Sequence, residues 1–399
     1  MMTQRPPFIF DPDITAIFTI AKRAGGEARL VGGVVRNWLM GLSLSDYDMA
    51  VNLPITVFSD MAEQAGLRVI PTGLSHGSVT VISGMHQIEV TQTRADISTD
   101  GRHAVIGFAP DFTADASRRD FTINALYLDE EGTLFDPLDG QGDIARCQLR
   151  FIGDAKQRIA EDYLRILRAF RLMSQMPQLS LSEQDVQAIY AMREGLLQLS
   201  GNRIGAEMQK CLGGDGWQKA VSALADCDCD KVLFGTAFQV LSDGLFDGIS
   251  YQDLTENWLA RLALLLPETA QQAIFEKCAM SNADKAYLMS LYQPFSKAEL
   301  TGLMGKDWQK IAYFHQGDSL ADRLLVQSYY QKSDITKSRL RQIAQFTAPP
   351  CPVSGHDLRQ AGIGEGPEIG KLLLQAKQLF ADSDFSADKQ TILAALTDA

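Results

Sequence analysis

The spacing of hydrophobic and polar positions changes along the chain, and the change falls near residue 150. Short apolar runs that alternate with polar residues lie almost entirely before it. Two of them, SVTVIS (78–83) and QIEVTQT (87–93), flank the turn Gly84-Met85-His86 and predict a β-hairpin. Helical patterns lie in three segments of the same region, near 13–24, 34–41 and 54–65. Mixed helices and strands are therefore expected over the first 150 residues.

Strand signals almost vanish from about residue 154 onward. Long stretches rich in Leu, Ala and Gln take their place, and Gly or Pro clusters interrupt them, as at Gly213-Gly214-Asp215-Gly216 and Pro349-Pro350-Cys351-Pro352. The predicted fold class is an α+β head, a small β-sheet with helices, followed by an all-α remainder.

Composition excludes several classes of protein. Hydrophobic residues make up 46% and charged residues 22% of the 399, which is typical of a globular chain. No apolar run approaches the ~20 residues of a membrane span, and the first residues do not resemble a secretory signal. The six cysteines form no CxxC pair, which argues against a disulfide framework or a zinc site. These features predict a protein of the reducing cytoplasm, and nothing in the sequence indicates a protein partner.

The net charge of −12 argues against extensive contact with nucleic acid, because phosphates are bound by Lys and Arg. Residues 146–171 differ from the rest, since they hold seven basic side chains against three acidic ones. A polyanion would therefore have to be bound locally.

One interval combines two weak signals for phosphate chemistry. A glycine pair in LVGGVVRNWLMG (30–41) permits close approach of the backbone to a phosphate. Asp46 and Asp48 follow in D-x-D spacing, which on a strand turns both carboxylates to one face, where they can hold Mg²⁺. D-x-D also occurs elsewhere in the chain, so the short interval after the glycines is what distinguishes this pair.

Motifs in a fixed order then show a resemblance to a known family. The pattern GG-x-VR followed by D-x-D resembles the signature of the nucleotidyltransferase superfamily that includes DNA polymerase β. The branch is the class II one that holds tRNA CCA-adding enzymes and bacterial poly(A) polymerases. Further matching motifs are HGSVTV (76–81), IEVTQTR (88–94), SRRDFTINAL (117–126), DPLDG (136–140) and EDYLRILRAFR (161–171).

The resemblance implies template-independent addition of CCA to the 3′ end of tRNA from CTP and ATP. It implies a catalytic head over 1–150, a nucleotide-selecting helical neck over 151–215 and a tRNA-binding helical body over 216–399. The catalytic residues would be Asp46 and Asp48, which would hold two Mg²⁺ ions, with Glu89 either a third ligand or an outward-facing strand acid. The nucleotide-binding residues would be Gly33, Arg36, Arg119, Asp162, Arg165, Arg168 and Arg171.

A single helix over 159–173 is expected to carry the base-reading residues, with an apolar stripe on one side and Asp162, Arg165, Arg168 and Arg171 on the other. Cytosine and adenine each present an amino donor beside a ring-nitrogen acceptor. Asp162 could accept from the first and Arg165 could donate to the second, which would select both bases. The alternative is a surface helix with ion pairs.

Some choices stay open in the sequence. Asn124 could line the pocket or satisfy backbone groups, and Arg118 could form a structural pair with Asp120. Asn37 stands where the family usually has Asp after the Arg of GG-x-VR. Poly(A) polymerase is the alternative activity, partial enzymes that add only CC or only A come next, and a catalytically inactive RNA-binding relative is the remote alternative.

Hydrogen-bond polarity predicts the effect of exchanging the two base-reading residues. Asp162→Arg combined with Arg165→Asp presents a donor to the carbonyl, and an acceptor to the ring N–H, of uracil or guanine. The double variant should lose CTP and ATP incorporation and gain weak use of UTP or GTP. The expected change in selectivity is about tenfold or more, because a base contact contributes ~1–3 kcal/mol. Single-nucleotide incorporation assays measure it, and unchanged preference for CTP and ATP would place base recognition elsewhere.

Overall fold

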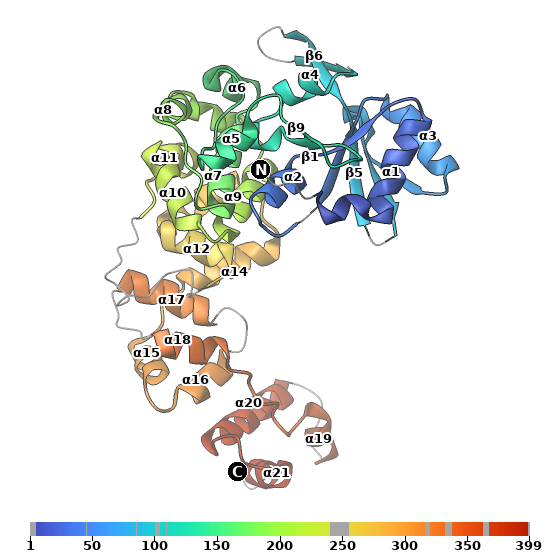
Figure 1. Ribbon diagram of the computed structural model, residues 1–399. Helices are drawn as coiled ribbons and strands as arrows, with labels where there is room; N and C mark the ends of the chain where they lie inside the picture. Colours follow the sequence, from blue (N-terminus) through green and yellow to red (C-terminus); the bar gives the residue numbers. More distant parts are fainter. Residues whose placement is uncertain are drawn as a thin grey trace. The chain divides into compact units, whose positions relative to one another are not determined.

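The computed structural model describes residues 5–44, 46–84, 86–99, 104–108, 110–239, 255–315, 320–331, 337–361 and 367–397. The chain divides into two compact units (Figure 1). The first comprises Met1–Phe238 with Glu276–Ala279, and the second comprises Gln239–Phe275 with Met280–Ala399. These units are defined by their internal contacts, whereas the boundaries expected at 150 and 215 divide the chain by function. The functional boundaries stay a prediction.

A mixed seven-stranded sheet forms the first part of unit 1. Its strands are β1 Ala28–Val31, β2 Tyr47–Val51, β3 Arg68–Gly73, β4 Ser78–Ser83, β5 His86–Gln92, β8 Tyr127–Leu128 and β9 Leu134–Phe135. The order across the sheet is β3-β4-β5-β2-β1-β8-β9, and only the β2–β5 pair is parallel. The expected hairpin is β4–β5, in which Ser83 pairs with His86, while Met85 of the turn lies outside the described residues. A separate two-stranded ribbon joins β6 Arg94–Thr99 to β7 Ala104–Phe108.

The three helices expected in the head are present, with ends shifted by one to two residues: α1 Pro12–Arg23, α2 Gly33–Leu39 and α3 Ile55–Gln64. The first begins where it does because the Asp11 side chain accepts a hydrogen bond from the Asp13 amide, which satisfies a donor at the helix start. The other helices of unit 1 are α4 Phe112–Ser117, α5 Gly140–Ala145, α6 Ala155–Glu161, α7 Leu164–Gln175, α8 Glu183–Met192, α9 Gly201–Gly213, α10 Trp217–Asp226 and α11 Cys229–Phe234. The expected α+β head is confirmed.

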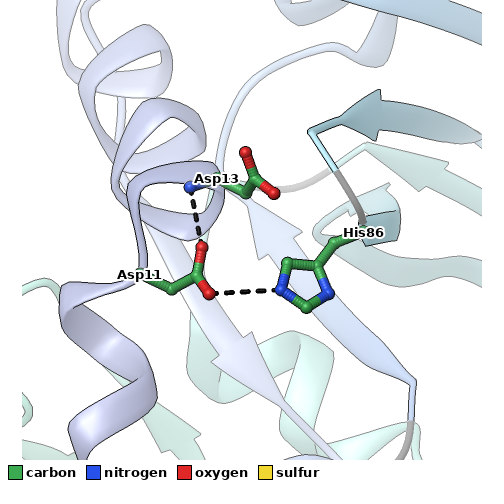
Figure 2. A group of neighbouring side chains, drawn as sticks. All are labelled: Asp11, Asp13 and His86. Atoms are coloured by element: carbon green, nitrogen blue, oxygen red, sulfur yellow. Dashed lines mark hydrogen bonds and ion pairs between the residues drawn. The ribbon is translucent and has the colours of Figure 1, made fainter.

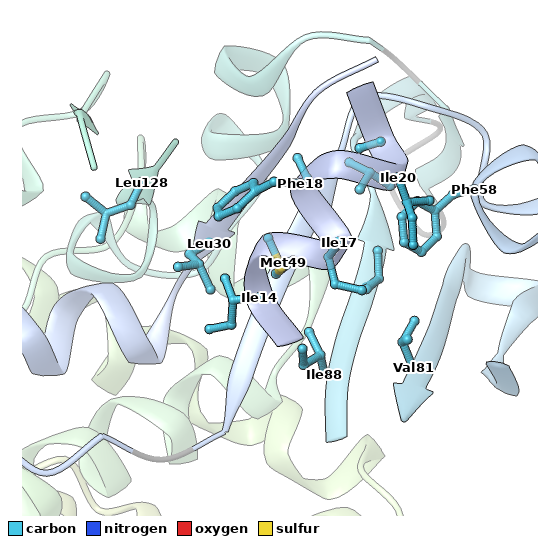
Figure 3. Close-up of a cluster of buried hydrophobic side chains, with 14 of the residues drawn as sticks. Ile14, Ile17, Phe18, Ile20, Leu30, Met49, Phe58, Val81, Ile88 and Leu128 are labelled. Carbon is cyan, nitrogen blue, oxygen red and sulfur yellow. The ribbon is translucent and has the colours of Figure 1, made fainter. Parts of the chain in front are cut away.

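Helices α1 and α3 pack on one face of the sheet and enclose the largest core of the head (Figure 3). Ile14 and Ile17 of α1, Phe58 of α3 and Leu30 and Ile88 of the sheet are fully buried in it. This core fixes the central strands in position, so residues on their opposite face project from a firm support.

The helix expected over 159–173 is wrong as a single element. The structure has α6 and α7 with a break at Asp162, whose φ of −156° and ψ of 104° are extended. The Asp162 side chain accepts a hydrogen bond from the amide of Leu164, the first residue of α7, at 3.1 Å. A hydrogen bond from the backbone to a nearby Asp side chain competes with helix continuation, and periodicity alone does not show this.

The described residues of unit 2 form helices joined by loops and no strand, as the sequence indicates. Its elements are α12 Trp258–Leu265, α13 Gln271–Lys277 (whose end belongs to unit 1), α14 Asn282–Tyr292, α15 Lys297–Met304, α16 Trp308–Phe314, α17 Leu320–Gln331, α18 Lys337–Ala344, α19 Gly355–Gln360, α20 Pro367–Asp382 and α21 Lys389–Thr397. Within the described part of the chain, no helix combines the length and apolar content of a membrane span.

The head core makes a stability prediction. Phe58→Ala should lower the free energy of unfolding by about 3–5 kcal/mol, because the ring is fully buried and its removal leaves a cavity. The neighbouring Val57 is 42% exposed, so Val57→Ala is a matched control with little effect. Urea denaturation followed by circular dichroism gives both values. Equal losses in the two variants would contradict this packing.

Candidate active site

A glycine turn connects β1 to α2 at the edge of the site. Gly32 has a φ of +75°, a conformation that favours glycine, and α2 begins at the next residue, Gly33. A Cβ atom on Gly32 would lie 3.8 Å from Nη1 of Arg119 and 4.0 Å from Oδ2 of Asp48. The turn therefore brings bare backbone next to a carboxylate and a guanidinium that are far apart in the sequence.

Acidic side chains gather beside this turn because of strand pairing. Asp48 of β2 is the register partner of Glu89 in the parallel neighbour β5, so both side chains leave the same face of the sheet. Burial raises the pKa of Asp48 to about 6, with further contributions from Glu89 and Asp46 that exceed the opposing effect of Arg119. The exposed Asp46 directly precedes β2. Repulsion among three carboxylates is what a bound cation would relieve.

Arg36 of α2 is buried next to the acids, at 9% exposure. Its Nη1 donates to Oδ1 of Asn124, while Nε and Nη2 donate to Oδ1 of Asn37 at 3.2 and 2.9 Å. Burial lowers the pKa of Arg36 to about 10, although Asp120 and Asp48 favour its charge. The side chain therefore stays charged near neutral pH.

The hydrogen bonds continue from Asn124 to α7. Nδ2 of Asn124 donates to Oδ1 of Asp120 at 3.1 Å, and Oδ2 of Asp120 forms an ion pair of 2.6 Å with Arg168. Burial opposes ionisation of Asp120, but Arg168, Asn124 and the Phe121 amide outweigh it, so the pKa of Asp120 is lowered. Asp120 thus has its ion pair with Arg168, and Asn124 bridges two side chains rather than backbone groups.

Arg119 is held by a second set of contacts on the sheet. Its Nη2 and Nε donate to Asp115 at 2.9 and 3.2 Å, and its Nε also donates to the Tyr127 hydroxyl, which in turn donates to Asp115 at 2.8 Å. Burial disfavours the charge of Arg119, but Tyr127 and Asp115 more than compensate and its pKa is raised. The guanidinium is therefore fixed and charged beside Gly32 and Asp48.

The structure does not pair the two expected base-reading residues with each other. Asp162 accepts from Nη2 of Arg203, which reaches both carboxylate oxygens at 2.8 and 3.0 Å. Arg165 forms an ion pair of 2.6 Å with Glu161. Each side chain thus has a protein partner, and the two lie at the break between α6 and α7.

The basic stretch 146–171 is largely neutralised. Arg171 pairs with Glu207 of α9 at 3.0 Å, and burial lowers the pKa of Arg171. Every arginine in the stretch has an acidic partner, including acids from outside it: Arg146 with Asp139 and Asp143, Arg150 with Asp143, Arg158 and Arg165 with Glu161, and Arg168 with Asp120. The local excess of positive charge is therefore smaller than the sequence suggests.

Among the described residues, a different group of three possible metal ligands lies close together. Oxygen and nitrogen atoms of Asp11, Asp13 and His86 all lie within 4.8 Å of one another (Figure 2). Their closeness has a structural reason, since Asp11 caps α1 and also contacts Nε2 of His86 at 3.1 Å, while Asp13 accepts from Ser83. His86 lies three residues before Glu89 on β5, so it faces the other side of the sheet from the site.

Several residues of the site were not predicted from the sequence. Arg94 is the last residue of the motif IEVTQTR, and the motif alone assigns it no role. In the structure, burial lowers the pKa of Arg94, and Glu89, Arg118 and Arg119 are near enough to affect that pKa as well. The others act by holding predicted residues in place: Asp115, Tyr127, Arg203 and Glu207. Spacing gives no signal for such contacts, because the partners are distant in the chain.

Comparison with known proteins identifies the family. A model of the poly A polymerase head domain matches residues 28–150. CCA tRNA nucleotidyltransferase 1 of Homo sapiens, a mitochondrial protein by its name, is 32% identical to this chain, over 98% of the chain and 92% of its own length. The chain belongs to the CCA tRNA nucleotidyltransferase family. The CCA-adding enzyme of Levilactobacillus brevis is also related, with 28% identity over 94% of this chain and 95% of its own.

Solved structures of CCA-adding enzymes share the fold. The enzyme from Bacillus stearothermophilus, solved in complex with CTP, superposes with a TM-score of 0.77 at 24% identity and covers 99% of this chain and 98% of its own. The Thermotoga maritima enzyme, solved with tRNA, has a TM-score of 0.65 at 18% identity over 97% and 96% of the two chains. The family expected from the motifs and the expected fold class are both confirmed.

The raised pKa of Asp48 predicts a pH dependence of stability. In the folded protein this carboxyl keeps a proton up to about pH 6, whereas in the unfolded chain it releases the proton near its ordinary value of 3.8. Its contribution to stability therefore falls as the pH rises from about 4 to 6 and stays low above that. Without divalent cations, Asp48→Asn should gain on the order of 2 kcal/mol relative to the unmodified protein between pH 4 and 7.5.

Urea denaturation in a chelating buffer at the two pH values measures this difference. Comparing the variant with the unmodified protein cancels the titration of groups common to both. A difference that does not change with pH would show that Asp48 ionises as a solvent-exposed carboxyl does.

Proposed function

We propose that the protein adds CCA to the 3′ end of tRNA, using CTP and ATP and no nucleic-acid template. Membership of the CCA tRNA nucleotidyltransferase family supports this activity. The observation that carries the proposal is the convergence of Asp48 and Arg119 on the glycine turn at Gly32, with Glu89 beside Asp48 on the neighbouring strand. Carboxylates for a cation, a fixed arginine and accessible backbone are the groups that nucleotidyl transfer requires.

Asp46 and Asp48 are proposed to hold two Mg²⁺ ions, with Glu89 as an additional ligand. The fit rests on the oxygen donors and on the raised pKa of Asp48, which is caused first by burial and then by the neighbouring carboxylates Glu89 and Asp46. When bound, the ions would lower the pKa of the terminal ribose hydroxyl and offset charge on the α-phosphate and the leaving pyrophosphate. The task of the chain is to hold the carboxylates close together and correctly placed.

Arg36 and Arg119 are proposed to bind the triphosphate, together with the backbone at Gly33. Both arginines are charged, and both are near enough to Asp48 to affect its pKa. Arginine suits the task because its planar group grips phosphate oxygens in pairs. Arg168 and Arg171 of α7 are proposed to extend this set, and their effect on the pKa of Arg36 supports their proximity to it.

The base is proposed to be read by Asp162 and Arg165. Their location at the start of α7 supports this, because the hydrogen bond from the Leu164 amide fixes the Asp162 side chain against the first turn of that helix. A base that takes these two side chains would displace Arg203 from the first and Glu161 from the second.

The division of labour along the chain is also proposed. Residues 1–150 would catalyse, 151–215 would select the nucleotide and 216–399 would bind tRNA. A cytoplasmic location is proposed as well, because six cysteines without a CxxC pair are typical of a reducing compartment, although a relative carries a mitochondrial name.

One assay separates the proposal from its alternatives. The purified protein is incubated with tRNA that lacks its 3′ end, Mg²⁺, and CTP and ATP singly and together. Addition of CCA supports the proposal, and partial enzymes would stop after CC or require an existing CC. Long A tails would indicate a poly(A) polymerase, and the absence of any addition would favour an inactive RNA-binding protein.

The carboxylates predict a specific loss of activity. Asp46→Ala or Asp48→Ala should abolish both C and A addition and leave tRNA affinity nearly unchanged, because the carboxylates act in the transition state while tRNA affinity comes from dispersed phosphate contacts. Gel shift gives the affinity, and the incorporation assay gives the rate. Asp60→Ala, an exposed aspartate on α3, is the control. Near-normal turnover in either variant would remove this pair from the active site.

A further inference from the structure

Asn37 of α2 connects two parts of the site. On one side it contacts Arg36, which is proposed to bind the triphosphate. On the other it contacts the segment that leads to Asp46, a proposed cation ligand. A catalytic role for this connection rests on the proposed function, whereas the contacts of Asn37 do not depend on it.

The amide of Asn37 has one acceptor and one donor, and its neighbours use both. Oδ1 accepts from Nε and Nη2 of Arg36, and Nδ2 donates to the carbonyl oxygen of Ser43 at 3.0 Å. A guanidinium can only donate and a carbonyl can only accept, so this orientation of the amide is fixed by chemistry. The main-chain carbonyl of Asn37 also accepts from the Leu42 amide at 2.9 Å.

Asn37 therefore clamps two consecutive residues, Leu42 and Ser43, onto the end of α2. The chain leaves this clamp three residues before Asp46. The same amide fixes Arg36, whose other branch leads through Asn124 to Asp120 and α7. We propose that Asn37 is a positioning residue, which keeps the segment carrying Asp46 in register with Arg36 and so with the bound triphosphate.

A carboxylate would not be equivalent at this position. Aspartate would still accept from Arg36, but its second oxygen would face the Ser43 carbonyl without a proton to donate. An acceptor facing an acceptor is repulsive, so the chain from Ser43 onward would move away from α2, while the main-chain bond to Leu42 and the contact with Arg36 would remain. In this chain the amide is the group that satisfies both neighbours.

Two variants separate the two contacts. Asn37→Asp keeps the Arg36 contact and loses the Ser43 contact, so hydrogen exchange of residues 40–46 should become faster. The affinity for Mn²⁺ in the absence of nucleotide should fall about fivefold. The kcat should also fall about fivefold, with KM for CTP unchanged. Asn37→Ala loses both contacts, so it should also raise KM for CTP and ATP. The matched control is Gln64→Glu, the same amide-to-carboxylate change at an exposed position on α3.

Exchange mass spectrometry, Mn²⁺ titration and steady-state kinetics are measured on the full chain, at temperatures well below each variant's melting temperature. Unchanged exchange in Asn37→Asp, or unchanged Mn²⁺ affinity and kcat despite faster exchange, would overturn the proposal. A more active Asn37→Asp would also overturn it. If the unmodified protein adds no nucleotide, the proposed function fails instead. The hydrogen-exchange and Mn²⁺-affinity measurements still decide the role of Asn37 in that case.

Discussion

Burial of a charged arginine beside the carboxylates is the constraint on which the site depends. Arg36 is almost inaccessible to water, so each of its donors needs a protein acceptor. Asn37 and Asn124 supply the acceptors. The amide of Asn124 in turn donates to the buried carboxylate of Asp120, and Asp120 is stabilised by its ion pair with Arg168. Satisfying one buried group therefore fixes side chains on α2, on the segment before β8 and on α7. The firm sheet beneath them holds the carboxylates against this network.

Much of this could be predicted from the sequence because it rests on local patterns. The helices of the head, the hairpin and the change to an all-helical remainder follow from spacing of apolar residues. Asp48 could be predicted as a candidate site residue because D-x-D follows the glycine pair. The alternation of side chains along a strand is enough to predict the face of the sheet from which it projects. The fold was predicted correctly for these reasons and the family from its ordered motifs, whereas the roles of individual site residues stay predictions.

What could not be predicted depends on contacts between particular side chains. The break at Asp162 coincides with a side-chain hydrogen bond that competes with an otherwise continuous helical pattern. The neutralisation of the basic stretch depends on acids such as Asp120 and Glu207, which lie outside it. Asp115 and Tyr127 hold Arg119 by hydrogen bonds. No motif or spacing in the sequence distinguishes these two residues, and only the folded chain brings them next to Arg119.

The ion pairs of Asp162 and Arg165 have a consequence for turnover. In the free protein Arg203 and Glu161 already occupy these side chains, so a base that binds them, as proposed, would exchange one set of contacts for another. Its net binding free energy is then the difference between two sets, which is small even when each contact is good. Departure is eased in the same way, because the intramolecular partners are ready to return. If these side chains read the base as proposed, such exchange would help successive nucleotides to bind and leave the same site.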